Sequence, residues 1–213
     1  MVSPNFPEPP PSMDPTPLET IDEMLELLAS RAKAWVDVPI PERIDLLQRS
    51  IEATLAVSEE WVGAACKAKG IAPESPRAGE EWLAGPVTVI RNLRLLIETL
   101  EAGGQPQLPK IWTHANGQKI AQVFPTNALD KVMFGGISAE VWIEPGEEVT
   151  QGRIYREKAA GKASEGGVAL VLGAGNVASI GPMDALYKLF ADDEVVILKT
   201  NPVNAYLGPF IER

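Results

Sequence analysis

The stretch from Val168 to Asn204 most constrains how this 213-residue chain can fold. An apolar run, a glycine-rich turn, an amphipathic segment of helical periodicity and a second apolar run follow one another there. This order of strand, turn, helix and strand is typical of the opening of a parallel nucleotide-binding sheet. The sequence therefore predicts an α/β fold in which residues 166–213 form the first βαβ unit of a Rossmann-like cofactor domain. That unit is expected to be incomplete, because two strands are too few to close a sheet.

The residues before this unit begin with a tail and continue with helices. Residues 1–17 are rich in proline and lack apolar periodicity, which favours an extended or disordered tail. Helical periodicity starts at Leu18, and a second helix is expected to begin near Pro41, which suits a first helical position. A third helix is expected around Trp61, and a fourth over residues 87–100.

The pattern then changes to that of strands. Residues 111–123 contain Asn116-Gly117, a pair typical of a tight hairpin turn. Residues 132–143 are again rich in β-branched and aromatic side chains and predict a further strand. Residues 18–165 are therefore expected to form an N-terminal helical region with a β-hairpin extension.

Charge and cysteine content exclude several classes of function. The net charge is −10 and the acidic residues are spread along the chain, which argues against nucleic acid or an anionic membrane as a partner. One cysteine and one histidine cannot form a tetrahedral zinc site, so no metal is expected. A lone cysteine also excludes an internal disulfide and favours a reducing, cytoplasmic setting. The longest apolar run, residues 166–183, contains Asn176 and several glycines, so a strand and a turn explain it better than a membrane span.

The turn after the first apolar run carries a nucleotide-binding pattern. Gly173, Gly175 and Ala178 fit G-x-G-x-x-G/A directly after a strand. In such a turn, backbone N–H groups at the start of a helix face the phosphates of a ligand. The alternative is that the glycines only make a tight turn, as they do in many α/β proteins.

The second apolar run does not end as a standard dinucleotide site does. An Asp or Glu is expected there to bind the ribose hydroxyls, but the strand ends in Lys199. Asp192, Asp193 and Glu194 come before the strand, at the opposite edge of the sheet. Lys199 would hydrogen-bond a ribose or attract a phosphate; the alternative is a solvated charge at the end of a strand. The paired acidic residues elsewhere, such as Asp192-Asp193 and Glu80-Glu81, are most simply interpreted as solvated.

These two strand ends resemble the aldehyde dehydrogenase superfamily. In that family the first strand of the cofactor domain ends in a turn that carries an asparagine, here Asn176, and the next strand ends in a lysine, here Lys199. The segment from Pro41 to Leu47 is similar to a helix of the family's N-terminal region. The resemblance covers most of residues 18–213 but is specific only over residues 168–204.

The resemblance implies a function and roles for individual residues. It implies an NAD- or NADP-dependent oxidation of an aldehyde by a homo-oligomer when full length. The side-chain amide of Asn176 would stabilise the substrate oxyanion, and Lys199 would contact the adenosine ribose. The remaining candidate cofactor-binding residues are Gly173 and Gly175, which the glycine-rich pattern indicates, and Asn201.

Two departures from the family pattern keep other functions open. The family's Pro-Trp-Asn-Phe-Pro is replaced by Gly-Ala-Gly-Asn-Val-Ala, and its Lys-Pro-Ser/Ala-Glu by Lys-Thr-Asn-Pro. An acyl-CoA-reducing relative and a non-catalytic nucleotide-binding or interaction module are the alternatives. The family's nucleophilic cysteine lies beyond Arg213 by position, and Cys66 is expected to be a structural residue on a helix. The chain by itself is therefore expected to be inactive.

Overall fold

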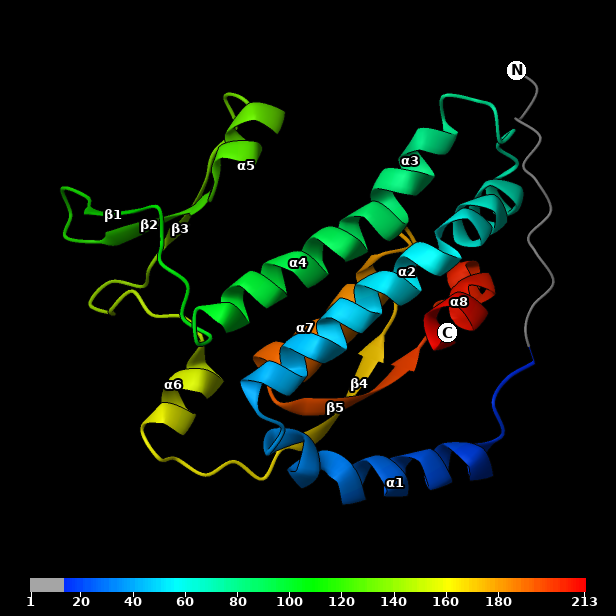
Figure 1. Cartoon of the computed structure of the whole chain (residues 1–213), viewed down its shortest axis with the longest axis horizontal. Helices are drawn as coiled ribbons and strands as arrows, with labels where there is room; N and C mark the ends of the chain where they lie inside the picture. The colour runs from blue at the N-terminus through cyan, green and yellow to red at the C-terminus, as the bar shows by residue number, and fades with distance from the viewer. Residues whose placement is uncertain (1–13) are drawn as a thin grey trace.

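Two separate sheets and several helices make up the part of the chain that the computed structural model describes, residues 14–213 (Figure 1). The fold is mixed α/β. The helices that bear on the site are α1 (Leu18–Val36), α2 (Ile40–Lys69), α4 (Thr88–Glu101), α6 (Arg153–Ala159) and α7 (Ile180–Ala191). Shorter helical segments are α3 (Ala78–Trp82), the π-helical η1 (Leu83–Val87), α5 (Ala128–Met133), the 3₁₀ segment η2 (Pro202–Leu207) and α8 (Gly208–Glu212). The predicted tail lies outside the described residues except for residues 14–17, which precede α1.

The longest helix, α2, joins two segments that the sequence analysis kept apart. It runs without interruption from Ile40 to Lys69 and ends at Gly70, whose φ of 64° is left-handed. The prediction of a separate helix around Trp61 was therefore wrong, because no residue between the two periodic segments breaks the helix. α2 and α4 lie side by side in front of α7 (Figure 1). Their facing side chains form the main core, which includes Leu47, Val57, Trp61, Leu93 and Leu100.

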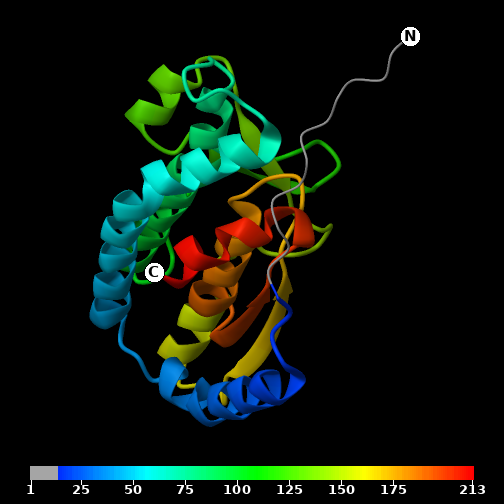
Figure 2. The same cartoon turned by 90° about the vertical axis from the view of Figure 1, so that its right-hand side faces the viewer.

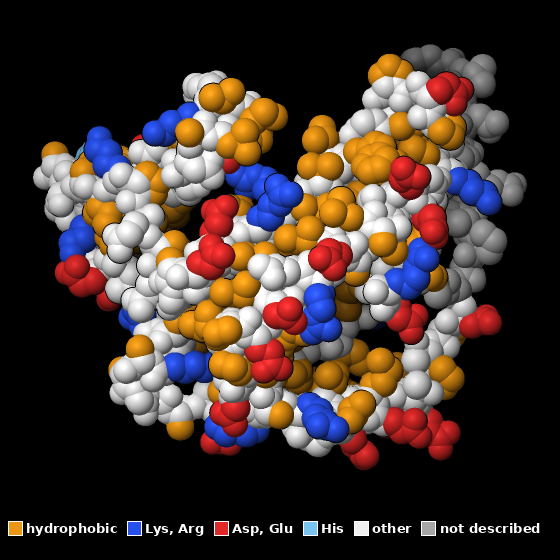
Figure 3. Space-filling model, in the orientation of Figure 1, with side chains coloured by type: hydrophobic (Ala, Val, Ile, Leu, Met, Phe, Trp, Pro, Cys, Tyr) orange, Lys and Arg blue, Asp and Glu red, His pale blue; other side chains and the backbone are white. Residues whose placement is uncertain are grey.

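An arm of three antiparallel strands projects away from these helices (Figure 1). β1 (Lys110–Thr113) pairs with β2 (Lys119–Phe124), and β2 pairs with β3 (Ala139–Trp142). The hairpin predicted from Asn116-Gly117 is confirmed, with Gly117 at φ 85°. The strand predicted over residues 132–143 is confirmed only for β3 and was wrong over residues 132–138. Asn127 caps a short helix that ends at Met133, by accepting a hydrogen bond from the backbone N–H of Asp130, and a turn follows it. The far end of the arm exposes apolar side chains of α5, seen as an orange cap in Figure 3, including Leu129, Val132 and Met133.

The second sheet has two parallel strands joined by α7, as the sequence predicted. β4 (Gly167–Leu172) pairs with β5 (Glu194–Lys199) along its whole length. One face packs on α7, where the position of a Cβ on Gly181 would lie 3.6 Å from Leu198. α1 crosses the other face near the start of the strands (Figure 2). α1 does not reach the ends of the strands, and Leu170 and Leu172 are therefore 63% and 66% exposed.

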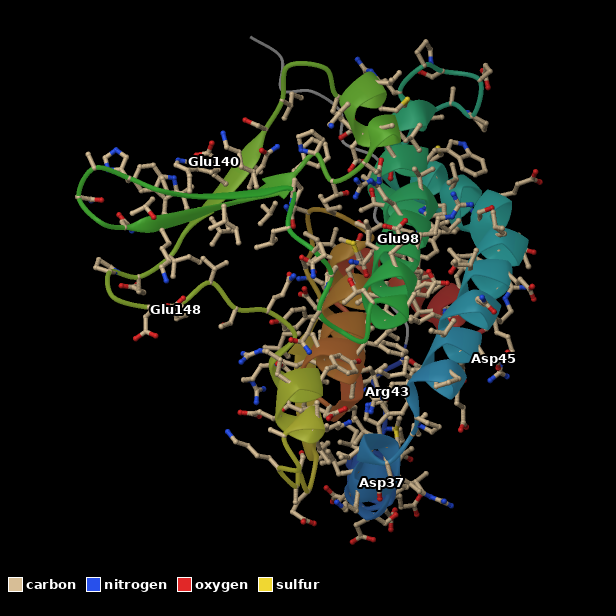
Figure 4. All side chains as sticks on the ribbon, turned by 60° about the vertical axis from the view of Figure 1, so that its left-hand side comes forward. Asp37, Arg43, Asp45, Glu98, Glu140 and Glu148 are labelled. Carbon is tan, nitrogen blue, oxygen red and sulfur yellow. The ribbon has the colours of Figure 1, made fainter. Side chains whose placement is uncertain are left out.

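A buried ionic cluster joins α1, α2, α6 and the turn between α7 and β5. Arg43 points inward from α2 to the junction of these elements (Figure 4). One of its Nη atoms lies 2.6 Å from the carboxylate of Asp193, and both side chains are 1% exposed. The interpretation of Asp192-Asp193 as solvated is wrong for Asp193. The same holds for Glu81, which is 2% exposed and paired with Lys69 at 2.7 Å. Glu140 and Glu148, in contrast, point outward from the arm (Figure 4).

Candidate functional site

The carboxyl ends of β4 and β5 lie next to each other and bring the predicted site residues together. Leu172 is paired with Lys199, and the backbone N–H of Gly173 donates a hydrogen bond to the carbonyl of Lys199 at 2.8 Å. The glycine-rich turn therefore begins beside the last residue of the neighbouring strand. In open parallel sheets, ligands bind outside this edge.

Both glycines of the turn serve the packing of the turn on β5. A Cβ on Gly173 would lie 3.2 Å from the carbonyl oxygen of Lys199. A Cβ on Gly175 would lie 3.0 Å from Oδ1 of Asn201. Because the glycines have no side chains, the turn can lie close to the residues after β5. The close approach that the glycine pattern predicted toward a ligand is here made to the chain's own backbone and to Asn201.

Two asparagines after β5 hold this arrangement. The side chain of Asn201 accepts a hydrogen bond from the backbone N–H of Val203 at 3.0 Å and so caps η2. Asn204, which is 7% exposed, donates from Nδ2 to the carbonyl of Ala174 at 2.9 Å. Sequence reasoning missed Asn204, because Asn-Pro-Val-Asn is typical of an ordinary turn and carries no signal for a contact 30 residues away.

Asn176 and Lys199 are exposed and make no side-chain hydrogen bond with any residue from 14 to 213. Side chains alternate between the faces of a strand, and Leu198 faces α7, so Lys199 emerges on the opposite face. Lys199 shares that face with the exposed Leu172, its register partner. Both polar side chains are therefore available to a ligand at the end of the sheet.

The turn is longer than a standard dinucleotide turn. α7 begins at Ile180, two residues after Ala178, whereas in the G-x-G-x-x-G/A pattern the helix begins within the motif. Ser179 lies between them, and its backbone N–H donates to the carbonyl of Ala84 in η1 at 3.1 Å. The turn is thus fixed to the helical region at one end and to β5 at the other.

The interior of the turn leaves little room. The cavity enclosed by the turn, α7 and η2 has a volume of about 10 Å³, enough for a single water molecule. Its lining includes Gly173, Ala178, Leu198 and Asn204. A larger ligand would therefore lie against the outer surface of the turn, where Asn176 and Lys199 are exposed.

Cys66 is unsuited to act as a nucleophile. It is 1% exposed and packs with Val62 and Ala78. Burial raises the pKa of its thiol, and the nearby carboxylate of Glu81 raises this pKa further, against a smaller opposing effect of Lys69. The expectation of a structural cysteine is therefore supported by its surroundings.

Among residues 14–213, His114 contacts side chains of the arm and not the residues of the candidate site. It is on the hairpin of the arm, where its ring packs on Trp142 at a centroid distance of 5.3 Å and its Nδ1 lies 3.1 Å from Oδ1 of Asn116. Cys66 belongs to α2 and His114 follows β1, so the lone cysteine and the lone histidine do not form a catalytic pair in the described residues. Within residues 14–213, no three His, Cys, Asp or Glu side chains are grouped so as to hold a metal ion.

Comparison with known protein families, curated proteins and solved structures finds no match to this chain. Over residues 14–213, each helix is too short or too polar to cross a membrane.

Proposed function

We propose that the chain forms the cofactor-binding start of an NAD- or NADP-dependent oxidoreductase that acts on aldehydes. In this proposal β4, α7 and β5 are the first unit of a Rossmann-like sheet. The observation that carries it is the presence of two exposed polar side chains, Asn176 and Lys199, at adjacent carboxyl ends of two parallel strands. This edge of a parallel sheet is the usual place for a dinucleotide.

Lys199 would bind the adenosine half of the cofactor. Its ammonium group is exposed, and no carboxylate of residues 14–213 lies within 4.0 Å of it. An ammonium group donates hydrogen bonds to ribose hydroxyls and attracts a phosphate. The same position therefore suits NAD and NADP, in place of an acidic residue that would repel the 2′-phosphate of NADP.

Asn176 would stabilise negative charge on the substrate oxygen. Its side-chain Nδ2 is a donor without a partner among the described residues, on a turn held by Gly173, Ser179 and Asn204. A donor on a fixed turn needs little rearrangement to bind the negative charge that develops on a carbonyl oxygen. Such donors lower the activation free energy by about 3–4 kcal/mol. The bound NAD(P) supplies the hydride acceptor.

The nucleophile in this proposal is not Cys66, because its thiol is buried and its pKa is raised. In this proposal the thiolate that attacks the aldehyde is supplied by a residue other than Cys66. The chain as it stands is then expected to bind cofactor but not to oxidise aldehydes.

Cofactor titration tests the proposal. NAD⁺ and NADP⁺ are titrated separately into the protein by calorimetry, for the wild type and for Lys199→Ala. The loss of a charge-assisted hydrogen bond should weaken binding by about 1.5–3 kcal/mol, or roughly tenfold or more. Lys131→Ala removes the same charge from exposed α5 and serves as the control, which should bind as the wild type does.

Asn176→Ala separates the two roles. It should leave cofactor affinity within about twofold, because its amide is assigned to the substrate rather than to the dinucleotide. Gln107→Ala, which removes an exposed amide from a loop, is the matched control. No binding of either dinucleotide by the wild type, or equal affinity in Lys199→Ala, would contradict the proposal.

A further inference from the structure

A second cavity lies between α4, α6 and α7, away from the carboxyl ends of β4 and β5. Its volume is about 500 Å³, within the range of small-molecule sites. The loops around Gly104 and Gly152 close one side of it. A neighbouring cavity of about 260 Å³ shares Pro106, Thr150, Gln151 and Arg156 with it. Arg156 thus borders both spaces.

Arg156 is partly buried as a residue, and its guanidinium has no counter-charge among residues 14–213. Its Nε donates to the carbonyl of Gln151 at 2.8 Å, which fixes the plane of the group. No carboxylate among residues 14–213 lies within 4.0 Å of it, and its two Nη atoms make no hydrogen bond there. The free N–H groups of the two Nη atoms are open to solvent, and they match the geometry of a carboxylate or a phosphate.

The other charged groups at the cavity neutralise one another. Arg153 lies 3.4 Å from Glu157 and 3.5 Å from Asp192. Asp192 is also paired with Lys188 at 2.9 Å. The charge left over at the cavity is therefore the positive charge of Arg156.

The rest of the lining is largely apolar. Leu96 and Leu100 of α4 lie on one side, and Phe190 and Ala191 of α7 lie on the other. A bare inorganic ion would leave this surface against water, whereas an organic anion would cover it. Thr150, which lines both cavities as Arg156 does, adds a polar residue to the lining.

We propose that this cavity binds a small organic anion whose carboxylate or phosphate group pairs with Arg156 and whose apolar part lies between α4 and α7. This site is separate from the proposed cofactor site and does not depend on it. The fixed guanidinium supplies two parallel donors, and the apolar walls select a ligand with a hydrophobic body.

Calorimetric titration of the full chain tests the proposal with four probes: sodium benzoate, sodium acetate, sodium phosphate and sodium chloride, at equal ionic strength. Benzoate carries a carboxylate and an apolar ring, acetate carries a carboxylate with little apolar surface, and phosphate carries the alternative head group. Benzoate should bind more tightly than acetate, and all three oxyanions more tightly than chloride. Phosphate binding tighter than acetate binding would identify the head group as a phosphate.

Three variants assign the site. Arg156→Gln should weaken oxyanion binding by about tenfold or more, because the charge-assisted hydrogen bonds are lost. Arg156→Lys keeps the charge but not the fork and should bind with intermediate affinity. Arg49→Gln makes the same change of charge at an exposed pair with Asp45 and should bind as the wild type does.

Two results would overturn the proposal. Wild-type binding of oxyanions no tighter than that of chloride rejects the site without any variant. Unchanged binding in a folded Arg156→Gln protein, checked by circular dichroism, rejects Arg156 as the ligand. If that variant does not fold, the wild-type series and Arg156→Lys decide the question.

Discussion

Arg43 and Asp193 form an ion pair of 2.6 Å, although 150 residues separate them in the sequence. Arg43 also donates to the backbone carbonyls of Trp35 and Val38, at 2.9 and 3.0 Å. Lys158 of α6 lies 2.7 Å from the second oxygen of Asp193. One buried group thus joins the turn between α1 and α2 to α6 and to the turn before β5.

Removal of one partner from this pair should destabilise the protein strongly. Asp193→Ala leaves the buried charge of Arg43 uncompensated, which costs about 3–5 kcal/mol of the free energy of unfolding. Arg43→Ala leaves Asp193 paired with Lys158 and should cost less. Arg49→Ala breaks an exposed pair with Asp45, at 3.0 Å, and should cost at most about 1 kcal/mol. Urea unfolding followed by circular dichroism measures both. Similar losses for the buried and the exposed pair would show that Arg43 and Asp193 are not buried as described.

Glycine at position 166 is required by a close approach of α1 to β4. Gly166 has φ 72°, and a Cβ there would lie 2.7 Å from the carbonyl oxygen of Ala32. Gly161 has a similar φ of 74° but nothing within 4 Å of its Cβ position, so Gly161→Ala isolates the cost of the backbone conformation. We expect Gly166→Ala to lower the free energy of unfolding by at least about 1 kcal/mol more than Gly161→Ala does. The reason is that the clash of the new Cβ with Ala32 adds to the strain of the left-handed backbone. Thermal unfolding of the two variants gives the difference, and equal losses would count against the packing of α1 on β4.

The arm is held to the helices by an ion pair that depends on pH. Asp130 is 4% exposed and lies 2.7 Å from Arg91 of α4. Burial raises the pKa of Asp130, but hydrogen bonds from Thr126 and the pair with Arg91 outweigh this effect and hold it below its usual range. A lowered pKa in the folded state means that the stabilisation is present above about pH 4, the pKa in the unfolded chain, and is lost as the pH falls through the folded value.

Asp130→Asn should therefore remove an acid-sensitive part of the stability. At pH 7 we expect the variant to lose about 1–3 kcal/mol of the free energy of unfolding. The difference in this free energy between wild type and variant should narrow as the pH is lowered to 3, as measured by urea unfolding at each pH. Asp45→Asn, in an exposed pair, is the control and should show no comparable gap. A gap that stays constant with pH would exclude the Asp130 carboxylate as its source.

Cys66 should be protected from thiol reagents in the folded protein. Its burial, and then the carboxylate of Glu81, raise its pKa, so the reactive thiolate forms only at a pH above that of an ordinary thiol. At pH 8 a disulfide reagent should label it no faster than the chain opens, and it should react at once in denaturant. Rapid stoichiometric labelling of the native protein would contradict both the burial and the exclusion of Cys66 as a nucleophile.

Sequence patterns were sufficient where structure depends on near neighbours. The apolar runs predicted β4 and β5, and Asn116-Gly117 predicted the hairpin, because the chemistry of strands and tight turns is local. Periodicity alone did not show that α2 is continuous. It also could not distinguish strand from helix at Val132, where the cap formed by Asn127 decides.

The charged residues show why the rest could not be predicted. Asp193 and Glu81 look like solvated acids in the sequence, but each is buried against a basic side chain of α2, Arg43 for Asp193 and Lys69 for Glu81. In the candidate site, the positions of Asn176 and Lys199 follow from strand ends and could be predicted. The hydrogen bond from Asn204 to the carbonyl of Ala174 depends on how η2 packs on the turn, so it could not be predicted from the sequence.

The packing of α1 on β5 also sets an order of events during synthesis. Synthesis of α1 is finished at residue 36, but the strand on which it packs, β5, is finished only when Lys199 has been added. At the usual rates of translation, roughly 10–30 s pass between the two events. Throughout this interval the helix presents Ala32, Trp35 and Val36 without the surface that covers them later. The newborn chain therefore offers chaperones a target at its N-terminal end that the finished protein has hidden.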